Sequence, residues 1–191
     1  LDAALDFKRA GGTDLVLVHK PDFDNLPGDE EGIKEAYADT IDMAASVRKE
    51  LELGVRVVLG PHPAAWAHQI EPLGMEGANE LHLAAVQIAL DNCAEGLAVG
   101  VGEVGRPHWD VGSGVMEQAD AVLEEVLSMC SAAGVPAQLH LDANGERTYG
   151  EVARICERAG MPRHMAIHHH AQADVSRGFT HGLTPSVIVG K

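Results

Sequence analysis

GVGEVGRPHWD, at residues 100–110, is the stretch that decides the fold. A short apolar run at residues 97–101 leads into it and is typical of a buried strand. This strand delivers one acid, Glu103, into a loop that is punctuated by glycines. An ionised carboxylate is costly to bury without a partner, so the sequence predicts that other segments supply partners for Glu103.

Two later segments have the same form. VPAQLHLD predicts a strand that ends on His140, and HMAIHHHA predicts a strand that ends on a histidine triplet. The carboxyl ends of parallel strands in an α/β barrel meet on one face, so these side chains are expected to lie close to Glu103. Because side chains alternate along a strand, His168 and His170 are expected to face away from His169. A carboxylate and two imidazoles indicate part of a metal-dependent hydrolase site.

The rest of the chain alternates between helical and strand patterns. A loop bounded by prolines is expected at residues 61–74. The predicted strands lie at residues 14–19 and 55–60, from 97 onward, up to 140, up to the histidine triplet, and from 186 to 189, and the predicted helices at 3–10, 31–53, 79–95, 115–133 and 144–159.

Six strands are too few for a closed (β/α)₈ barrel, which has eight strands and about 250 residues. An open doubly wound sheet is the alternative. GVGEVG fits the letters of a dinucleotide-binding loop, but Arg-Pro-His follows where a helix should begin. We therefore expect an α/β fold, a TIM-type barrel with about six of its eight strands, in a single domain over residues 1–191.

Composition and charge restrict the class of protein. Hydrophobic residues make up 46% of the chain and aromatic residues 4%, which is typical of an α/β interior, and no apolar run approaches the roughly 18 residues of a membrane span. The net charge of −15 disfavours non-specific nucleic-acid binding, although a bound metal can still attract a phosphate ester. Cys93, Cys130 and Cys156 show no zinc-knuckle spacing, so we expect buried thiols in a cytoplasmic protein.

Six runs that cover most of the chain resemble the archaeal branch of the TatD-related metal-dependent hydrolases, within the amidohydrolase superfamily of TIM barrels. GEVGRPH is the most specific of them. The runs are AGGTDLVLV at 10–18, LGPHP at 59–63, GEVGRPHW at 102–109, QLHLD at 138–142, HHHA at 168–171 and HGLTPSV at 181–187.

This resemblance implies one or two divalent ions, such as Zn, Mn or Mg. Glu103 would be the metal-bridging carboxylate that also orients a water molecule, and His140 and His169 would be ligands. The family also carries an H-x-H motif on its first strand and, on its last, an Asp that serves as general base. Neither is in these 191 residues, so we expect a fragment that is truncated at both ends.

Three further residues are candidates for substrate binding or for holding the ligands in place: Arg106, His108 and His62. An arginine fork matches phosphate oxygens, and a ligating imidazole needs an outer partner. Each candidate also has a structural interpretation, such as a salt bridge between Glu103 and Arg106 or a hydrogen-bonded core position for His140. The remaining histidines and the tryptophans are expected on the surface (His68 and His82) and in packing or rim positions (Trp66 and Trp109).

The reaction that this set of residues favours is hydrolysis of an ester bond by a metal-activated water. A small phosphoester or a nucleic-acid end is the expected substrate, with no membrane partner. Two alternatives remain open: a barrel scaffold that has lost its chemistry, and a deaminase or lactonase on the same metal scaffold.

Overall fold

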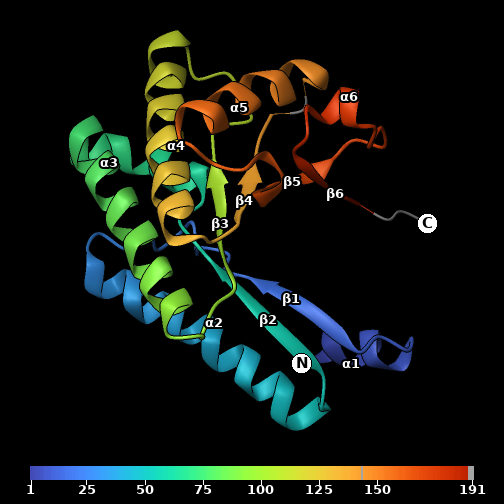
Figure 1. The fold of residues 1–191 in the computed structure, drawn as a ribbon. Helices are drawn as coiled ribbons and strands as arrows, with labels where there is room; N and C mark the ends of the chain where they lie inside the picture. The colour runs from blue at the N-terminus through green and yellow to red at the C-terminus, as the bar shows by residue number, and fades with distance from the viewer. Residues whose placement is uncertain (143, 189–191) are drawn as a thin grey trace.

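A curved sheet of parallel strands forms the centre of the molecule (Figure 1). The computed structural model describes residues 1–142 and 144–188. The strands of this part of the chain lie side by side in chain order: β1 (Asp14–Val18), β2 (Gly54–Leu59), β3 (Gly100–Gly105), β4 (Ala137–His140), β5 (Ala166–Ala171) and β6 (Thr184–Val187). Sequential neighbours are typical of a barrel, whereas the order reverses in a doubly wound sheet. The six strands form a curled half-barrel, so the expected fold class is confirmed.

Helices cover the outer side of this half-barrel. Figure 1 shows α2, α3, α4 and α5 arranged along one side of the curved row of strands. Their bounds are α2 (Glu30–Leu51), α3 (Pro63–Ala94), α4 (Ser113–Ala133) and α5 (Glu146–Arg158), and shorter helices are α1 (Asp2–Arg9), the 3₁₀ turn η1 (Arg163–Met165) and α6 (Arg177–Thr180). Each of the first four connections between strands contains one of these long helices, and the fourth also contains η1. Parallel neighbours need such long crossover connections.

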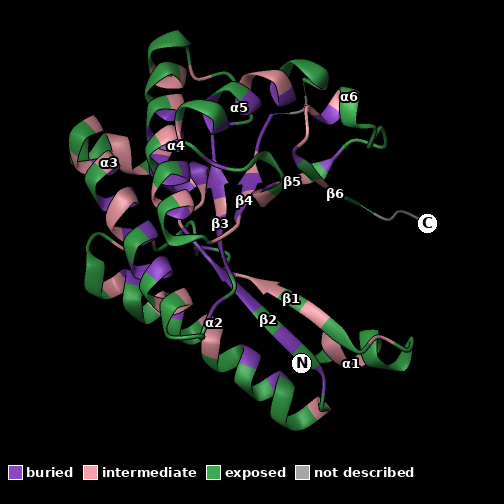
Figure 2. Ribbon diagram, in the orientation of Figure 1, coloured by how far each residue is buried: buried purple, intermediate pink, exposed green. Residues whose placement is uncertain are grey.

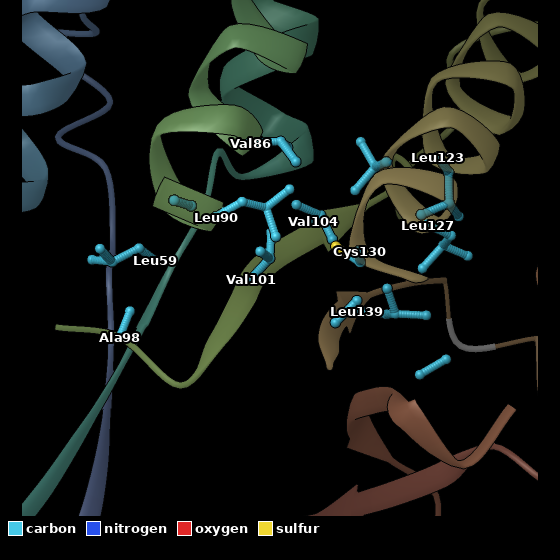
Figure 3. Close-up of a cluster of buried hydrophobic side chains, with 14 of the residues drawn as sticks. Leu59, Val86, Leu90, Ala98, Val101, Val104, Leu123, Leu127, Cys130 and Leu139 are labelled. Atoms are coloured by element: carbon cyan, nitrogen blue, oxygen red, sulfur yellow. The ribbon is translucent and has the colours of Figure 1, made fainter. Parts of the chain in front are cut away.

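The core lies between the strands and the long helices α2 to α5. Val101 and Val104 of β3 and Leu139 of β4 are fully buried among side chains from these helices (Figure 3). Strands β2 to β4 are mostly buried, whereas the edge strand β1 is half-exposed (Figure 2), with Val16 at 56% exposure. The middle strands are therefore the most buried part of the sheet, and Glu103 and His140 lie toward their carboxyl ends.

Helix α3 begins at Pro63, which corrects the expected loop at residues 61–74. Proline suits the first turn of a helix, and the side chain of His62 caps this end by accepting a hydrogen bond from the Ala64 N–H at 3.0 Å. The prolines and glycines that suggested a loop instead produce a kink, with Pro72 inside the helix and Gly74 at φ 73°.

The extended α3 also changes the expected positions of two side chains. His82 was expected on the surface, but it is only 3% exposed because it faces the core from the second half of α3. Trp66 packs in a small cluster with Ala78 and Ala119, and its indole N–H donates to Asn79 Oδ1 at 2.8 Å. The packing role expected for Trp66 is therefore confirmed.

Smaller differences concern strand ends and cysteines. Glu103 lies within β3 and not in a loop after it. β6 begins at Thr184, two residues before the expected start, and Val189 lies outside the described residues. Cys130 and Cys156 are buried as expected, and Cys93 is half-buried. Across residues 1–142 and 144–188, no helix combines the length and the apolar character needed to cross a membrane.

Candidate metal centre

An irregularity in β3 turns Glu103 toward the inner side of the sheet. In a regular strand Val101 and Glu103 would share a face, since side chains alternate. The pairing register between β3 and β4 shifts between Val101 and Val104, and both valines are fully buried. Glu103 retains 13% side-chain exposure and lines a cavity at the carboxyl edge. Irregular strand pairing of this kind re-aims side chains at functional sites.

Close contacts between strands support this arrangement. A Cβ at Gly60 would lie 2.7 Å from the backbone nitrogen of Gly102, and a Cβ at Gly102 would lie 2.6 Å from the Cβ of Gln138. Real Cβ atoms almost never come so close, so glycine at these positions allows β2, β3 and β4 to approach one another. The glycines of the 100–110 stretch therefore bring Glu103 within reach of the neighbouring strand.

Both strand-end histidines that were predicted to meet Glu103 contact its carboxylate. His140 Nδ1, at the end of β4, lies 2.9 Å from Glu103 Oε2. His169 Nε2, on β5, lies 2.9 Å from the other oxygen, Oε1. Two ligand atoms of a tetrahedral zinc ion with bonds of 2.0–2.1 Å lie about 3.3 Å apart. The separation of each histidine nitrogen from its nearest carboxylate oxygen is therefore a few tenths of an ångström shorter than that between two ligand atoms of a zinc ion.

His62 approaches the same carboxylate from the start of α3. Its Nε2 lies 3.3 Å from Glu103 Oε2, and ligand atoms of His62, Glu103 and His140 all lie within 4.8 Å of one another. However, His62 Nδ1 accepts the N–H of Ala64, so the neutral ring carries its proton on Nε2. In this tautomer Nε2 donates to Glu103. To bind a metal through Nε2, His62 would have to give up its hydrogen bond to the helix.

His169 has a partner that suits a ligand. Gln138 Nε2 lies 3.3 Å from His169 Nδ1. The two ends of a carboxamide are interchangeable by a flip about the terminal bond. With its oxygen toward the ring, Gln138 accepts a hydrogen bond from the Nδ1–H and leaves the Nε2 lone pair facing Glu103, the arrangement that metal-ligating histidines need.

The electrostatics favour the protonation states of Glu103 and His169 that bind metals. Burial acts to raise the pKa of Glu103, but hydrogen bonds from His140 and His62 and the charges of His169 and His140 outweigh it, so its pKa lies far below the usual range. Burial lowers the pKa of His169, against the opposing charge of Glu103. At neutral pH Glu103 is therefore ionised and His169 neutral, which are the forms that bind divalent ions.

Two more histidines surround the carboxylate cluster. His108 Nδ1 lies 2.9 Å from His140 Nε2, so His108 is the outer partner of a predicted ligand. The ring of His170 lies 3.8 Å from that of His169 between centroids, and both residues line the same cavity. The expectation that His170 faces away from His169 is wrong, because a register irregularity follows His169 and His170 has φ 57°.

The expectation for His168 is confirmed. It is 5% exposed and packs edge-on against Tyr149 of α5, on the outer side of the sheet, with a ring separation of 4.7 Å. Burial lowers its pKa to about 4, so the ring is neutral. His168 thus belongs to the core.

Arg106 lies behind the site and not in the cavity that contains Glu103. Its side chain is 4% exposed and its guanidinium contacts three carboxylates: Asp142 at 2.8 Å, Asp120 at 3.1 Å and Glu151 at 2.7 Å. Its backbone N–H also donates to the carbonyl oxygen of His140 at 3.2 Å. The contact with Glu103 that we considered is absent from the ion pairs of the described residues. Arg106 joins the ends of β3 and β4 to α4 and α5, which is a positioning role.

A cavity of about 590 Å³ contains the cluster. Besides the histidines and Glu103, it is lined by Lys20 and Phe23 of the loop after β1, and by His68, which is exposed on α3 as expected for a surface histidine. Lys20, Phe23, Gln138 and His170 were not predicted from the sequence as site residues. No local signal marks them, because their positions depend on how the loop and the β5 irregularity fold.

A parallel half-barrel with a carboxylate and several imidazoles at its carboxyl edge defines a barrel protein with a candidate metal centre. The chain belongs to the TatD related DNase family, whose family model matches residues 3–188. The resemblance noted in the sequence is therefore confirmed.

Two relatives illustrate this likeness. The chain is 24% identical over 189 residues to an uncharacterized protein of Methanocaldococcus jannaschii. The aligned region covers 98% of this chain and 65% of that protein. Its fold is similar to the crystal structure of a TatD-like protein from Archaeoglobus fulgidus, with a TM-score of 0.57 and 14% identity, over 91% of this chain and 64% of that one. The chain thus spans slightly less than two thirds of the length of each relative.

Proposed function

We propose that this chain contributes the main metal-binding residues of a hydrolase that cleaves phosphoester bonds, with a nucleic-acid end as the substrate. The observation that carries the proposal is the set of contacts around Glu103, whose two carboxylate oxygens each face an imidazole from a different strand. Membership of the TatD related DNase family supports a metal-dependent hydrolase in general. The ester bond and the nucleic-acid substrate are our inference.

The donor set fits one or two divalent ions. His140 faces Oε2 of Glu103 and His169 faces Oε1, so these three residues would together hold one ion or two. A bound divalent ion supplies a Lewis acid and lowers the pKa of a water molecule toward 7. Nitrogen and carboxylate ligands are compatible with Zn, Mn or Mg.

The other residues of the cavity have roles that suit a phosphate group. Lys20 is exposed at the rim and brings a positive charge. His62 holds its Nε2 proton toward the cluster and can donate it as a hydrogen bond to a phosphate oxygen, while its Nδ1 is fixed by Ala64. These donors favour an anionic substrate over a lactone, which offers no negative charge in its ground state.

A comparison of substrates tests the proposal. The purified chain, and the longest available form of the protein, are loaded with Zn, Mn or Mg and assayed on bis-p-nitrophenyl phosphate, on an end-labelled oligonucleotide, on a lactone and for adenosine deamination. We expect metal-dependent hydrolysis of the two phosphoesters, lost in Glu103→Gln and retained in Glu117→Gln, which removes an exposed carboxylate from α4. Metal-dependent turnover of the lactone or of adenosine alone would contradict the phosphoester assignment.

A further inference from the structure

A second cavity adjoins the metal centre on the side of β3 and α5. It has a volume of about 310 Å³, which is at the lower end of the range for small-molecule sites. Among the described residues, His108 is the only one that lines both this cavity and the one around Glu103. The other walls include Trp109, Met116 and Arg147. His108 therefore forms part of the boundary between the second cavity and the metal centre.

Trp109 offers an aromatic surface in this cavity. Its side chain is 38% exposed, which is unusual for so large an apolar group in a fold with few aromatic residues. Within the described part of the chain its aromatic contact is with His108, edge-on, at a ring separation of 5.1 Å. One edge-on contact leaves at least one face of the indole without a stacked ring. Such a face binds flat aromatic groups well.

The charges in the second cavity favour a neutral ligand. Its walls carry Arg106 and Arg147 against three carboxylates, those of Asp110, Asp142 and Glu151. Both arginines are already paired, since Arg106 contacts Asp142 and Glu151, and Arg147 donates to Glu151 at 2.8 Å. Arg106 is buried by its carboxylates, whereas Arg147 is exposed and contacts only Glu151 among the described residues, so the three carboxylates outnumber the arginines and disfavour a phosphate here. A phosphate fits the metal cavity, and an uncharged planar group fits here.

The two cavities lie close enough for a single small ligand to occupy both. Ring separations of 4.7 Å from His140 to His108 and 5.1 Å from His108 to Trp109 connect the carboxylate cluster to the indole. A nucleotide joins a phosphate to a planar heterocycle through one sugar. Its two ends therefore have the chemistry that the two adjoining cavities require.

We propose that the second cavity is a base subsite, in which the heterocyclic base of the terminal nucleotide stacks on Trp109 while its phosphate lies at the Glu103 cluster. This inference rests on the proposed function for the identity of the substrate. The base subsite itself requires no metal and no bond cleavage, so it can be tested separately.

Tryptophan fluorescence provides the test, because the chain has two tryptophans and Trp66 is 2% exposed. The metal-free chain is titrated with adenosine, with adenosine monophosphate and with ribose 5-phosphate, which has no base. Excitation at the red edge of the indole absorption, with free N-acetyltryptophanamide as a reference, excludes absorption by the nucleoside. We expect saturable quenching by adenosine and by its monophosphate, and none by ribose 5-phosphate.

Two variants locate the effect. Calorimetric titration of Trp109→Ala is expected to show about 5- to 100-fold weaker adenosine binding, with a smaller loss in Trp109→Phe, since base stacking on an aromatic ring has this magnitude. Phe23→Ala removes an exposed aromatic ring from the metal cavity and should leave adenosine binding unchanged. Equal affinity in the parent chain and Trp109→Ala, or loss in Phe23→Ala alone, would overturn the proposal.

The two proposals fail in different ways. Adenosine binding that depends on Trp109, together with no metal-dependent hydrolysis, would support the base subsite and contradict the hydrolase. Metal-dependent hydrolysis that is lost in Glu103→Gln, together with no saturable adenosine binding, would support the hydrolase and contradict the base subsite.

Discussion

The histidines that contact Glu103 differ in what their second ring nitrogen binds, and this difference decides whether each can be a metal ligand. His140 contacts the carboxylate through Nδ1 and bears no backbone hydrogen bond on its ring, as far as the described residues show. His62 uses Nδ1 to cap α3, which commits the proton of the neutral ring to Nε2. His140 and His62 lie at similar distances from Glu103, but His140 is free to bind a metal, whereas His62 caps a helix.

We predict that His140→Ala weakens zinc binding by at least about 10-fold, because the loss even of an outer partner of a ligand has an effect of that order. In contrast, His62→Ala should change zinc affinity by less than this and should cost about 1 kcal/mol of stability through the lost helix cap. Calorimetric zinc titration and urea unfolding measure both quantities. Equal losses of affinity in the two variants would show that His62 is a ligand.

A second prediction at this scale concerns His82. Burial, with a smaller contribution from the charge of His62, lowers its pKa to about 3, and its Nδ1 lacks a partner among the described residues. The folded state keeps the ring neutral, whereas the unfolded chain binds a proton as the pH falls below 6.5. The part of the unfolding free energy that depends on a neutral His82 is therefore fully present above pH 6.5 and is lost as the pH falls toward 3.

Over the window from pH 7 to pH 5, this residue alone should cost about 2 kcal/mol of unfolding free energy. His82→Leu should remove that part of the pH dependence and leave the stability at pH 7 equal or higher, since an unpartnered polar atom is lost. Urea unfolding at the two pH values provides the comparison. The prediction is wrong if His82→Leu loses as much stability as the parent chain.

At the scale of elements, the Arg106 cluster joins two strands and two helices. Arg106→Met leaves Asp142, Asp120 and Glu151 without their shared cation, so we expect a loss of about 3–5 kcal/mol in unfolding free energy. The matched control is Arg158→Met, which breaks an ion pair between α5 and α4 whose arginine is 53% exposed, with an expected loss below about 1 kcal/mol. Thermal unfolding of both variants measures the difference, and similar losses would contradict the assigned role.

The elements that could be predicted from the sequence are those with clear periodicity. The strands that carry Glu103, His140 and His169 were predicted from apolar runs that end on polar residues, and their meeting point followed from the geometry of parallel strands. Whether Arg106 binds substrate or supports the ligands was left open, because its partners on α4, after β4 and on α5 lie 14, 36 and 45 residues away. No local pattern shows that such distant carboxylates converge.

Two local errors have the same kind of cause. Pro63 was interpreted as a loop residue, although at the first turn of a helix it is favourable when a side chain such as His62 caps the end. His170 was assigned to the outer side because alternation holds only while a strand stays regular, and the sequence HHHA does not reveal the left-handed backbone at its third histidine.

At the scale of the whole molecule, the net negative charge repels nucleic acid, whereas a metal ion bound at the site would attract a phosphate. With 29 acidic and 14 basic residues, the chain should not bind duplex DNA non-specifically, since that affinity comes from neutralised phosphates. We predict no detectable binding of a duplex to the metal-free chain at physiological salt in a polarisation assay. A divalent ion should strengthen the binding of a single-stranded oligonucleotide end, because the ion attracts its phosphate. Metal-independent, salt-sensitive duplex binding would contradict this.

The central claim is that Glu103 organises a metal site, and thermal unfolding with and without metal tests it most directly. The chain is stripped with a chelator, then unfolded alone and with Zn²⁺ or Mn²⁺, beside Glu103→Gln and the control Glu117→Gln. A metal concentration 100-fold above the dissociation constant should stabilise the parent chain and the control by about 2.7 kcal/mol, and should leave Glu103→Gln unchanged. Equal stabilisation of all three proteins, or none in the parent chain, would contradict the account.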